Sequence, residues 1–149
     1  MKKILYIDMD DVLVDFKSAF PYYAAETLEQ YDNHRDDIPG IFAKMKPLDG
    51  ALEAFSILSE TFEVFILSTA PWDNPSAWSD KLEWVKVYLG QAAYKRLILT
   101  HHKNLNRGDF LVDDRDKHGV REFNGQWIHF GSTRFPDWPT VMKYLLSKA

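Results

Sequence analysis

Three aspartates follow the first apolar run of the chain within four positions. The run Ile-Leu-Tyr-Ile at residues 4–7 leads directly into Asp8, and Asp10 and Asp11 come just after it. A short run with β-branched and aromatic members is typical of a buried parallel strand, so Asp8 is predicted at the carboxyl end of that strand. One aspartate there would suit a turn or a helix cap, but three repel one another unless a cation or a proton compensates them. A divalent ion bound by carboxylate oxygens, Mg²⁺ above all, is the chemistry that this pattern indicates.

Polar side chains also follow three later apolar runs. The carboxyl ends of parallel strands meet at one edge of a sheet, so these side chains are expected to converge on Asp8 although they lie far from it in the chain. A carboxylate nucleophile, hydroxyl groups, a fixed ammonium group and metal-binding acids are the groups that phosphoryl transfer requires. The side chains in question are Ser68 and Thr69, Lys103, and the pair Asp113 and Asp114.

The elements that must hold these side chains alternate between strand-like and helix-like segments. This alternation predicts right-handed β-α-β crossovers and a parallel sheet. We therefore expect an α/β fold, a Rossmann-like parallel sheet of about five strands with helices on both faces. Strands are predicted at 4–8, 62–67, 96–100, 110–112 and 127–130, and helices at 47–59, 76–89 and 137–147.

Residues 16–46 form an insertion in this alternation. A helix is expected over 14–31, interrupted near Pro21 because proline lacks the N–H group that a helix interior needs. The charged stretch 31–39 is typical of an exposed turn. Together these features predict a small helical cap, inserted after strand 1 and lying over the strand ends, within one domain that spans residues 1–149.

The predicted helix over 76–89 has Ser76 as its N-cap. Three tryptophans lie in or just before it, at Trp72, Trp78 and Trp84, and they could form a platform for stacking a base. Two of them fit one apolar helix face, so packing in the core is the favoured interpretation.

Length and composition limit the remaining classes of function. With 149 residues, 46% of them hydrophobic, the chain can build one full core. Its net charge of −4 and its lack of a basic stripe argue against a nucleic-acid polymer as partner. No apolar stretch approaches the length of a membrane span. The absence of cysteine excludes thiol chemistry and, with no secretory signal at the N-terminus, favours a cytoplasmic location.

Four segments carry a resemblance to a known family. They are 8–16 (DMDDVLVDF), 47–51 (PLDGA), 64–70 (VFILSTA) and 111–115 (LVDDR). In this order and spacing they resemble the haloacid dehalogenase superfamily of phosphohydrolases, and within it the 5′(3′)-deoxyribonucleotidases. The resemblance implies a phosphoric monoester hydrolase that dephosphorylates a small phosphomonoester, in particular a nucleoside monophosphate.

The resemblance also implies roles for individual residues. Asp8 would be the nucleophile that takes the phosphoryl group, and Asp10 the general acid that protonates the leaving oxygen. Ser68, with Thr69 beside it, would bind the phosphate, and Lys103 would neutralise the aspartyl-phosphate. The remaining roles are Mg²⁺ binding by Asp8, the Asp10 backbone carbonyl and Asp114, with Asp113 in support, and contact near the nucleoside by Phe16 and Arg115.

The sequence departs from the family pattern at Asp11, which replaces the glycine usual after the second aspartate. Three alternatives stay open at this stage: a phosphatase of another small phosphomonoester, a catalytically silent relative that binds nucleotide or phosphate, and a receiver domain of a response regulator. A receiver domain has its phosphorylated aspartate in the middle of the chain and its lysine last, whereas here Asp8 comes first and Lys103 precedes the final acidic pair. The order of the groups therefore favours an enzyme.

Overall fold

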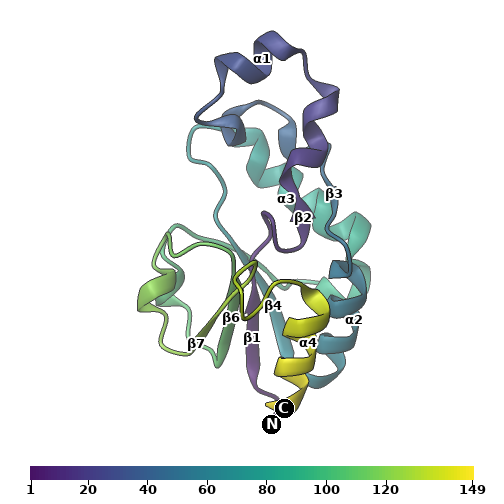
Figure 1. Ribbon diagram of the computed structural model, residues 1–149, viewed down its shortest axis with the longest axis vertical. Coiled ribbons are helices and arrows are strands. Elements are labelled where there is room, and N and C mark those ends of the chain that lie inside the picture. Colours follow the sequence, from purple (N-terminus) through teal and green to yellow (C-terminus); the bar gives the residue numbers. More distant parts are fainter.

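A central sheet of five parallel strands organises the computed structural model, which describes residues 1–149 (Figure 1). The strand order is β5-β4-β1-β6-β7, so the first strand lies in the middle. Tyr6 of β1 is in register with Phe65 of β4 and Leu111 of β6. The predicted α/β fold with about five parallel strands is confirmed. The strands are β1 (Ile4–Ile7), β4 (Glu63–Ser68), β5 (Leu97–Leu99), β6 (Phe110–Asp113) and β7 (Gln126–His129).

The two faces of the sheet are covered by different elements. Helices α2 (Ala51–Thr61) and α4 (Trp138–Ser147) lie side by side over one face, where Leu5 and Ile7 enter the main core (Figure 1). Tyr6 points the other way, as strand alternation requires, into a smaller cluster with Val120 and Phe123. The short 3₁₀ helix η6 (Val120–Glu122) supplies Val120 to that cluster, and η5 (Lys103–Leu105) lies against η6.

Helix α3 (Pro75–Tyr88) begins one residue before the predicted helix, because proline suits the first helical position. The prediction that Ser76 is its N-cap is wrong, since Asn74 occupies that position. The Asn74 side chain instead donates hydrogen bonds of 2.9 and 3.0 Å to the carbonyl oxygens of Asp36 and Ile38. These bonds tie the start of α3 to the inserted segment. A 3₁₀ turn, η4 (Gly90–Ala93), follows the helix.

The tryptophans around α3 differ in burial. Trp84 is 4% exposed and its indole N–H donates to the Met45 carbonyl at 3.1 Å, which confirms core packing for this residue. Trp78 is half-buried, but Trp72 is 78% exposed, so core packing is wrong for Trp72. The reason is local: Trp72 lies in the loop before the helix and is outside its buried face.

The inserted segment, residues 16–46, which we call the cap segment, stands beyond the carboxyl ends of the strands (Figure 1). A small antiparallel pair, β2 (Val14–Asp15) and β3 (Lys46–Pro47), joins both of its ends to the rest of the chain. The single interrupted helix predicted over 14–31 is wrong: it is divided into β2, a 3₁₀ helix that accommodates Pro21, and a short α-helix. The cap elements are η1 (Phe16–Tyr22), α1 (Ala25–Gln30), η2 (Arg35–Asp37) and η3 (Ile41–Ala43).

The two chain ends lie close together at the opposite end of the sheet from the cap segment (Figure 1). Lys3 Nζ donates to the Lys148 carbonyl oxygen at 2.6 Å. Helix α4 begins one residue after its predicted start, with Asp137 as its N-cap and the Asp137 carboxylate accepting a hydrogen bond from the Thr140 N–H at 3.0 Å. None of the helices combines the length and the apolar composition that crossing a bilayer requires.

Candidate active site

Asp8 lies at the carboxyl end of the central strand, with a buried side chain. Its backbone N–H donates to the Val112 carbonyl at 2.9 Å, which extends the strand pairing up to the carboxylate. Lys103 reaches it from η5, with Nζ 3.0 Å from Asp8 Oδ1 and 2.5 Å from Asp113 Oδ2. The structure therefore brings the predicted nucleophile and the predicted lysine into direct contact.

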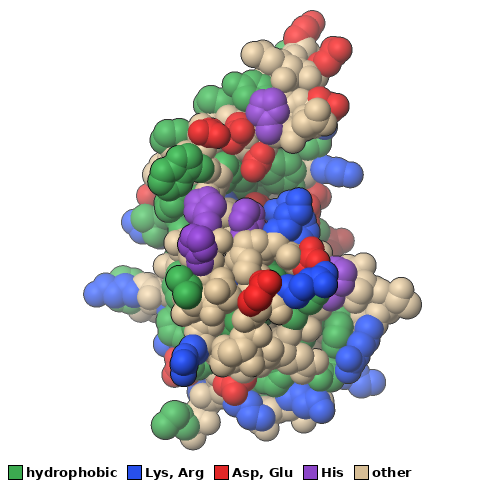
Figure 2. Space-filling model, turned by 90° about the vertical axis from the view of Figure 1, so that its left-hand side faces the viewer, with side chains coloured by type: hydrophobic (Ala, Val, Ile, Leu, Met, Phe, Trp, Pro, Cys, Tyr) green, Lys and Arg blue, Asp and Glu red, His purple; other side chains and the backbone are tan.

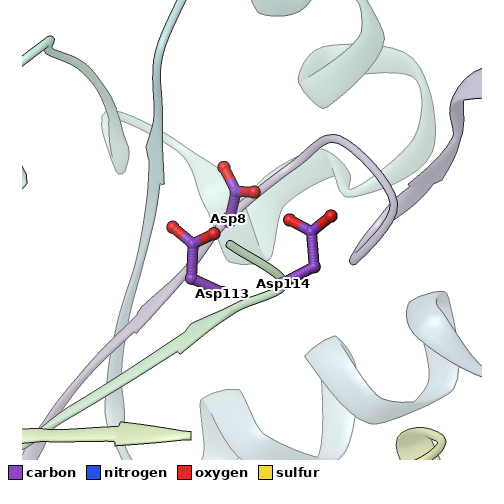
Figure 3. A group of neighbouring side chains, drawn as sticks. All are labelled: Asp8, Asp113 and Asp114. Atoms are coloured by element: carbon purple, nitrogen blue, oxygen red, sulfur yellow. The ribbon is translucent and has the colours of Figure 1, made fainter. Parts of the chain in front are cut away.

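Asp8, Asp113 and Asp114 form a cluster of carboxylates at the ends of β1 and β6 (Figure 3). One oxygen from each lies within 4.8 Å of the others. Both Asp113 oxygens have partners, Lys103 Nζ and the Arg115 N–H at 3.1 Å, whereas Asp114 Oδ1 is buried and has none. A buried carboxylate oxygen without a partner is costly unless a ligand supplies one. The oxygen donor set and this free atom fit a hard divalent cation.

The pKa values of these acids reflect the same crowding. Burial, followed by the negative charge of Asp8, raises the pKa of Asp113 to about 7 and that of Asp114 to about 8. Burial lowers the pKa of Lys103, but the carboxylates of Asp8 and Asp113 outweigh that effect, and the net shift is upward. The lysine is thus fixed as a cation, while the acidic pair releases its protons readily only when another positive charge arrives.

Lys81 is the functional residue that sequence reasoning missed. It projects from α3, is fully buried, and places Nζ 3.2 Å from Asp10 Oδ2, 2.8 Å from Ser68 Oγ and 2.9 Å from the Thr69 carbonyl oxygen. The sequence did contain a signal for this residue, because Lys81 lies one helical turn after Ala77, on the buried face of the helix. A lysine at a core position requires a charged or polar partner.

Asp10 presents one carboxylate oxygen to Lys81, while its other oxygen, Oδ1, is buried without a partner. Burial raises the pKa of this carboxyl group, and the positive charge of Lys81 opposes the shift without cancelling it. A carboxyl group that retains its proton more readily than usual is suited to donate it to a leaving oxygen.

The two hydroxyl residues after β4 take different positions. Ser68 is fully buried and its Oγ accepts the hydrogen bond from Lys81, which leaves its own proton free to donate. Thr69 lines the catalytic pocket, and its Oγ1 donates to the Thr100 carbonyl at 2.7 Å. This pocket has no hydrophobic lining; its wall is formed by Asp8, Asp10, Thr69, Lys103, Asp113, Arg115, Lys117 and His118.

Phe16 and Arg115 both border a cleft of about 440 Å³ that opens from Asp10 beneath the cap segment. The half-buried Phe16 ring packs edge-on against Phe20 and Phe42, with ring centroids 5.8 and 5.9 Å apart. Asp11 accepts a hydrogen bond from the Phe16 N–H at 3.1 Å and has a φ of 57°. That left-handed conformation explains the usual glycine at this position, and an aspartate tolerates it better than most residues.

The fold and this site define a haloacid dehalogenase-like hydrolase. A haloacid dehalogenase-like family hydrolase from Xanthomonas campestris superposes with a TM-score of 0.60 at 11% identity, covering 98% of this chain and 95% of that one. A superfamily hydrolase from Geobacter sulfurreducens gives 0.61 at 11% identity, covering 97% and 96%. At this identity the likeness concerns the fold.

Sequence comparison gives the family. The protein-family model described as "5′ nucleotidase, deoxy (Pyrimidine), cytosolic type C protein" matches residues 23–136 of this chain. A putative 5′(3′)-deoxyribonucleotidase of Vibrio phage KVP40 is 56% identical over 147 residues, covering 99% of this chain and 86% of that relative. The human cytosolic-type 5′(3′)-deoxyribonucleotidase is 29% identical, covering 83% and 76%. The chain belongs to the 5′(3′)-deoxyribonucleotidase family, a family of phosphoric monoester hydrolases, and the predicted resemblance is confirmed.

Proposed function

We propose that this enzyme removes the phosphate from nucleoside monophosphates, deoxynucleotides above all, in a Mg²⁺-dependent reaction through an aspartyl-phosphate. The observation that carries the proposal is the position of Asp8, which is held by Lys103 and faces a wholly polar pocket that it shares with Asp10. The names of the phage and human relatives support the substrate class.

Asp8 and Asp10 divide the bond-making and proton-transfer steps between them. An Asp8 oxygen attacks phosphorus, the bond from phosphorus to the nucleoside oxygen breaks, and Asp10 donates its proton to that oxygen. Asp10 then takes a proton from a water that attacks the aspartyl-phosphate, which releases inorganic phosphate and restores Asp8. The raised pKa of Asp10 suits the first of its two roles.

Three groups stabilise the phosphate during these steps. Lys103 neutralises negative charge at Asp8. Ser68 donates its hydroxyl proton to a phosphate oxygen, because the Ser68 oxygen already accepts a hydrogen bond from Lys81. Thr69, on the pocket wall, is the second candidate, and its hydroxyl would have to leave the Thr100 carbonyl to donate to the phosphate. Positive charge and fixed donors around the equatorial oxygens are the main source of catalysis in phosphoryl transfer.

Mg²⁺ is the proposed cofactor, with Asp8, the Asp10 backbone carbonyl and Asp114 as its ligands. The partnerless Asp114 Oδ1 supports this set, and Asp113 supports the site through its bond to Lys103. When bound, the ion would neutralise charge on the phosphate and orient it toward Asp8.

The remaining proposals concern the surroundings of the site. Phe16 and Arg115 lie near the nucleoside of the substrate, in the cleft that both residues line. Residues 16–46 act as a cap on one catalytic domain that spans residues 1–149. A cytoplasmic location is supported by the name of the human relative and by the absence of cysteine.

A phosphate-release assay tests the proposal. The purified protein is incubated with a panel of deoxy- and ribonucleoside 5′- and 3′-monophosphates, with 2-deoxyribose 5-phosphate and with other sugar phosphates, in Mg²⁺ or in EDTA. We expect Mg²⁺-dependent release from nucleoside monophosphates. Release confined to sugar phosphates would indicate another phosphomonoester as substrate, and no release from any compound would indicate a binding protein.

A further inference from the structure

Asn74 uses its side chain in a way that is unusual for its place in a helix. It is the N-cap residue of α3, where an asparagine side chain ordinarily accepts a hydrogen bond from a backbone N–H of the first turn, but here it makes no such bond. Asn74 is 2% exposed, and its amide group donates to two carbonyl oxygens of the cap segment, those of Asp36 and Ile38. The side chain that could stabilise the start of the helix therefore holds the cap segment instead.

Ser76 completes this network of hydrogen bonds. Its hydroxyl donates to Asn74 Oδ1 at 2.8 Å and accepts a hydrogen bond from the Gly40 N–H at 3.0 Å. Both polar atoms of the Asn74 amide group are thus hydrogen-bonded, and three backbone groups in residues 36–40 are bound to the start of α3. A buried polar network that is satisfied in this way rigidifies the segments that it joins. We call Asn74 and Ser76 together the clamp.

The clamp is one of two separate attachments of the cap segment. The other is the strand pair β2–β3, which joins both ends of the segment to the rest of the chain, and there Ser18 Oγ accepts a hydrogen bond from the Lys46 N–H at 2.8 Å. Between the two attachments η3 packs along α3, with Ile41 and Phe42 buried. A lid opens by rotation about a hinge, so attachment at a second point opposes that rotation.

Helix α3 also connects the clamp to the catalytic groups. Lys81 lies two turns after Asn74 in this helix, and its Nζ contacts both Asp10 and Ser68. The same ammonium group lies 4.6 Å from the centre of the Phe42 ring of the cap segment. The cap segment in the observed position therefore encloses the cation that orients the catalytic groups.

The clefts at the active site are already open in this arrangement. One of about 440 Å³ lies beside Phe16, another of about 270 Å³ lies beside His101, and Asp10 lines both. Figure 2 shows histidine side chains gathered on one side of the molecule, below the cap segment. Asp36, whose carbonyl oxygen accepts from Asn74, also lines both clefts, so the clamp fixes a wall of each. A substrate can therefore reach the catalytic pocket without movement of the cap segment.

We propose that the cap segment is a fixed wall of the active site rather than a moving lid, and that Asn74 is the positioning residue that holds it. The inference rests on the proposed function, because it concerns how that substrate enters and how its products leave. Without the clamp, only a fraction of the molecules would hold the cap segment in the position that binds substrate, and the apparent affinity falls by that fraction. Saturating substrate restores the position, so the loss concerns KM and not kcat.

A distance measurement tests the fixed position. The chain has no cysteine, so Glu29→Cys in α1 and Lys143→Cys in α4 together give two unique, exposed sites for spin labels. Pulsed electron paramagnetic resonance measures the distance between them in an Asp8→Asn background, which prevents turnover, with and without deoxycytidine monophosphate and Mg²⁺. We expect one narrow distribution that is the same in both states. A second, longer distance without nucleotide, or a shift when nucleotide binds, would show a moving lid and overturn the inference.

Asn74→Asp tests the clamp. Aspartate begins a helix as well as asparagine does, but its carboxylate cannot donate to the two carbonyl oxygens, so the effect arises in the cap segment. We expect the distance distribution to broaden toward longer values and hydrogen exchange at the Gly40 amide to become at least about tenfold faster. KM for deoxycytidine monophosphate should rise about tenfold, with kcat within about twofold of the parent. Asn124→Asp makes the same change before β7, at the amino ends of the strands, and should alter none of these values.

The outcomes separate this inference from the function on which it rests. Unchanged distances or an unchanged KM in Asn74→Asp would overturn the role of Asn74 while the proposed function stands. A parent enzyme that hydrolyses no nucleoside monophosphate refutes the proposed function, and the distances without nucleotide then still decide whether the cap segment is fixed. If thermal unfolding shows that Asn74→Asp is not folded, Ser76→Ala replaces it, because that change removes only the bonds of the Ser76 hydroxyl and should move the same values in the same direction.

Discussion

Lys81 Nζ lies 3.2 Å from Asp10 Oδ2, and the lysine side chain that makes this contact is entirely buried. The same ammonium group contacts Ser68 Oγ, so one cation orients both a carboxyl group that we propose as the acid and a hydroxyl that we propose as a phosphate donor. Lys81 does not line the catalytic pocket, which makes it a positioning residue that acts through its neighbours.

Replacing Lys81 by methionine tests that role. The change keeps most of the volume but leaves Asp10 without its cation, so we expect kcat to fall about 10- to 1,000-fold, within the range that general acid catalysis supplies. A change in the acid should also move the pH profile of kcat, which loss of packing alone would not do. Lys86→Met, on the exposed side of the same helix, is the matched control. Unchanged kcat and an unchanged pH profile in Lys81→Met would show that Lys81 only fills space.

Asp8→Asn tests the nucleophile. The amide retains the shape of the side chain and loses the charged oxygen that attacks phosphorus, so nearly all turnover should disappear while the far-ultraviolet circular dichroism spectrum is unchanged. Asp49→Asn makes the same chemical change at an exposed position and should retain full activity. Activity of Asp8→Asn within about tenfold of the parent would rule out covalent catalysis by this residue.

Substitutions of Asp113 and Asp114 test which of the two binds the metal ion and which supports the site. Asp114→Ala should raise the Mg²⁺ concentration needed for half-maximal activity more than Asp113→Ala does, because Asp114 has a free oxygen whereas both Asp113 oxygens are hydrogen-bonded. Titration of each variant with Mg²⁺ at saturating substrate measures the difference. A larger shift in Asp113→Ala would reverse the two roles.

The pKa values of the same pair predict how pH affects the metal-free protein. The folded state retains protons up to about pH 7 on Asp113 and about pH 8 on Asp114, while the unfolded chain releases them near pH 4. Because the folded state holds these protons more tightly than the unfolded chain, the free energy of unfolding falls as pH rises from about 4 to about 8. Mg²⁺ binding strengthens over the same pH range, because the ligand carboxyl groups must lose their protons to bind the ion. Thermal unfolding from pH 5 to 9, with Mg²⁺ or EDTA, should show stabilisation by the ion that grows with pH. Asp114→Asn should reduce that dependence, and equal dependence in the variant would contradict the assignment.

Phe16→Ala should lower kcat/KM for deoxycytidine monophosphate more than kcat/KM for 2-deoxyribose 5-phosphate, which has no base. We place the half-buried ring near the nucleoside, where stacking on a base is worth about 1–3 kcal/mol, and the same ring holds the cap segment through Phe20 and Phe42. We expect a loss of about 1–3 kcal/mol in the free energy of unfolding, below the loss for a fully buried phenylalanine. Denaturant unfolding and kcat/KM for the two substrates measure these effects. Equal losses on both substrates would show that Phe16 only holds the cap segment and does not contact the base.

Cap geometry was the least predictable part of the fold. The strands were predicted to within a residue or two because each is a short apolar run that ends in a polar group. Segment 16–46 carries few periodic signals, and its 3₁₀ turns depend on contacts with α3, such as those of Asn74. The exposure of Trp72 could not be predicted either, because a loop residue does not belong to a periodic hydrophobic pattern that would indicate its burial.

The sequence by itself determined the parallel sheet, the strand ends that carry Asp8, Thr69 and Asp114, the place of Lys103 in the loop after the third predicted strand, and the family to which the chain belongs. These follow from local patterns, because alternation and strand-end polarity are properties of short stretches and parallel topology gathers the strand ends at one edge. Only the tertiary structure decided that Lys81 contacts Asp10 and that the Trp72 side chain is exposed. Both depend on how α3 and its leading loop are oriented against the sheet, and that orientation is set by packing between segments far apart in the chain.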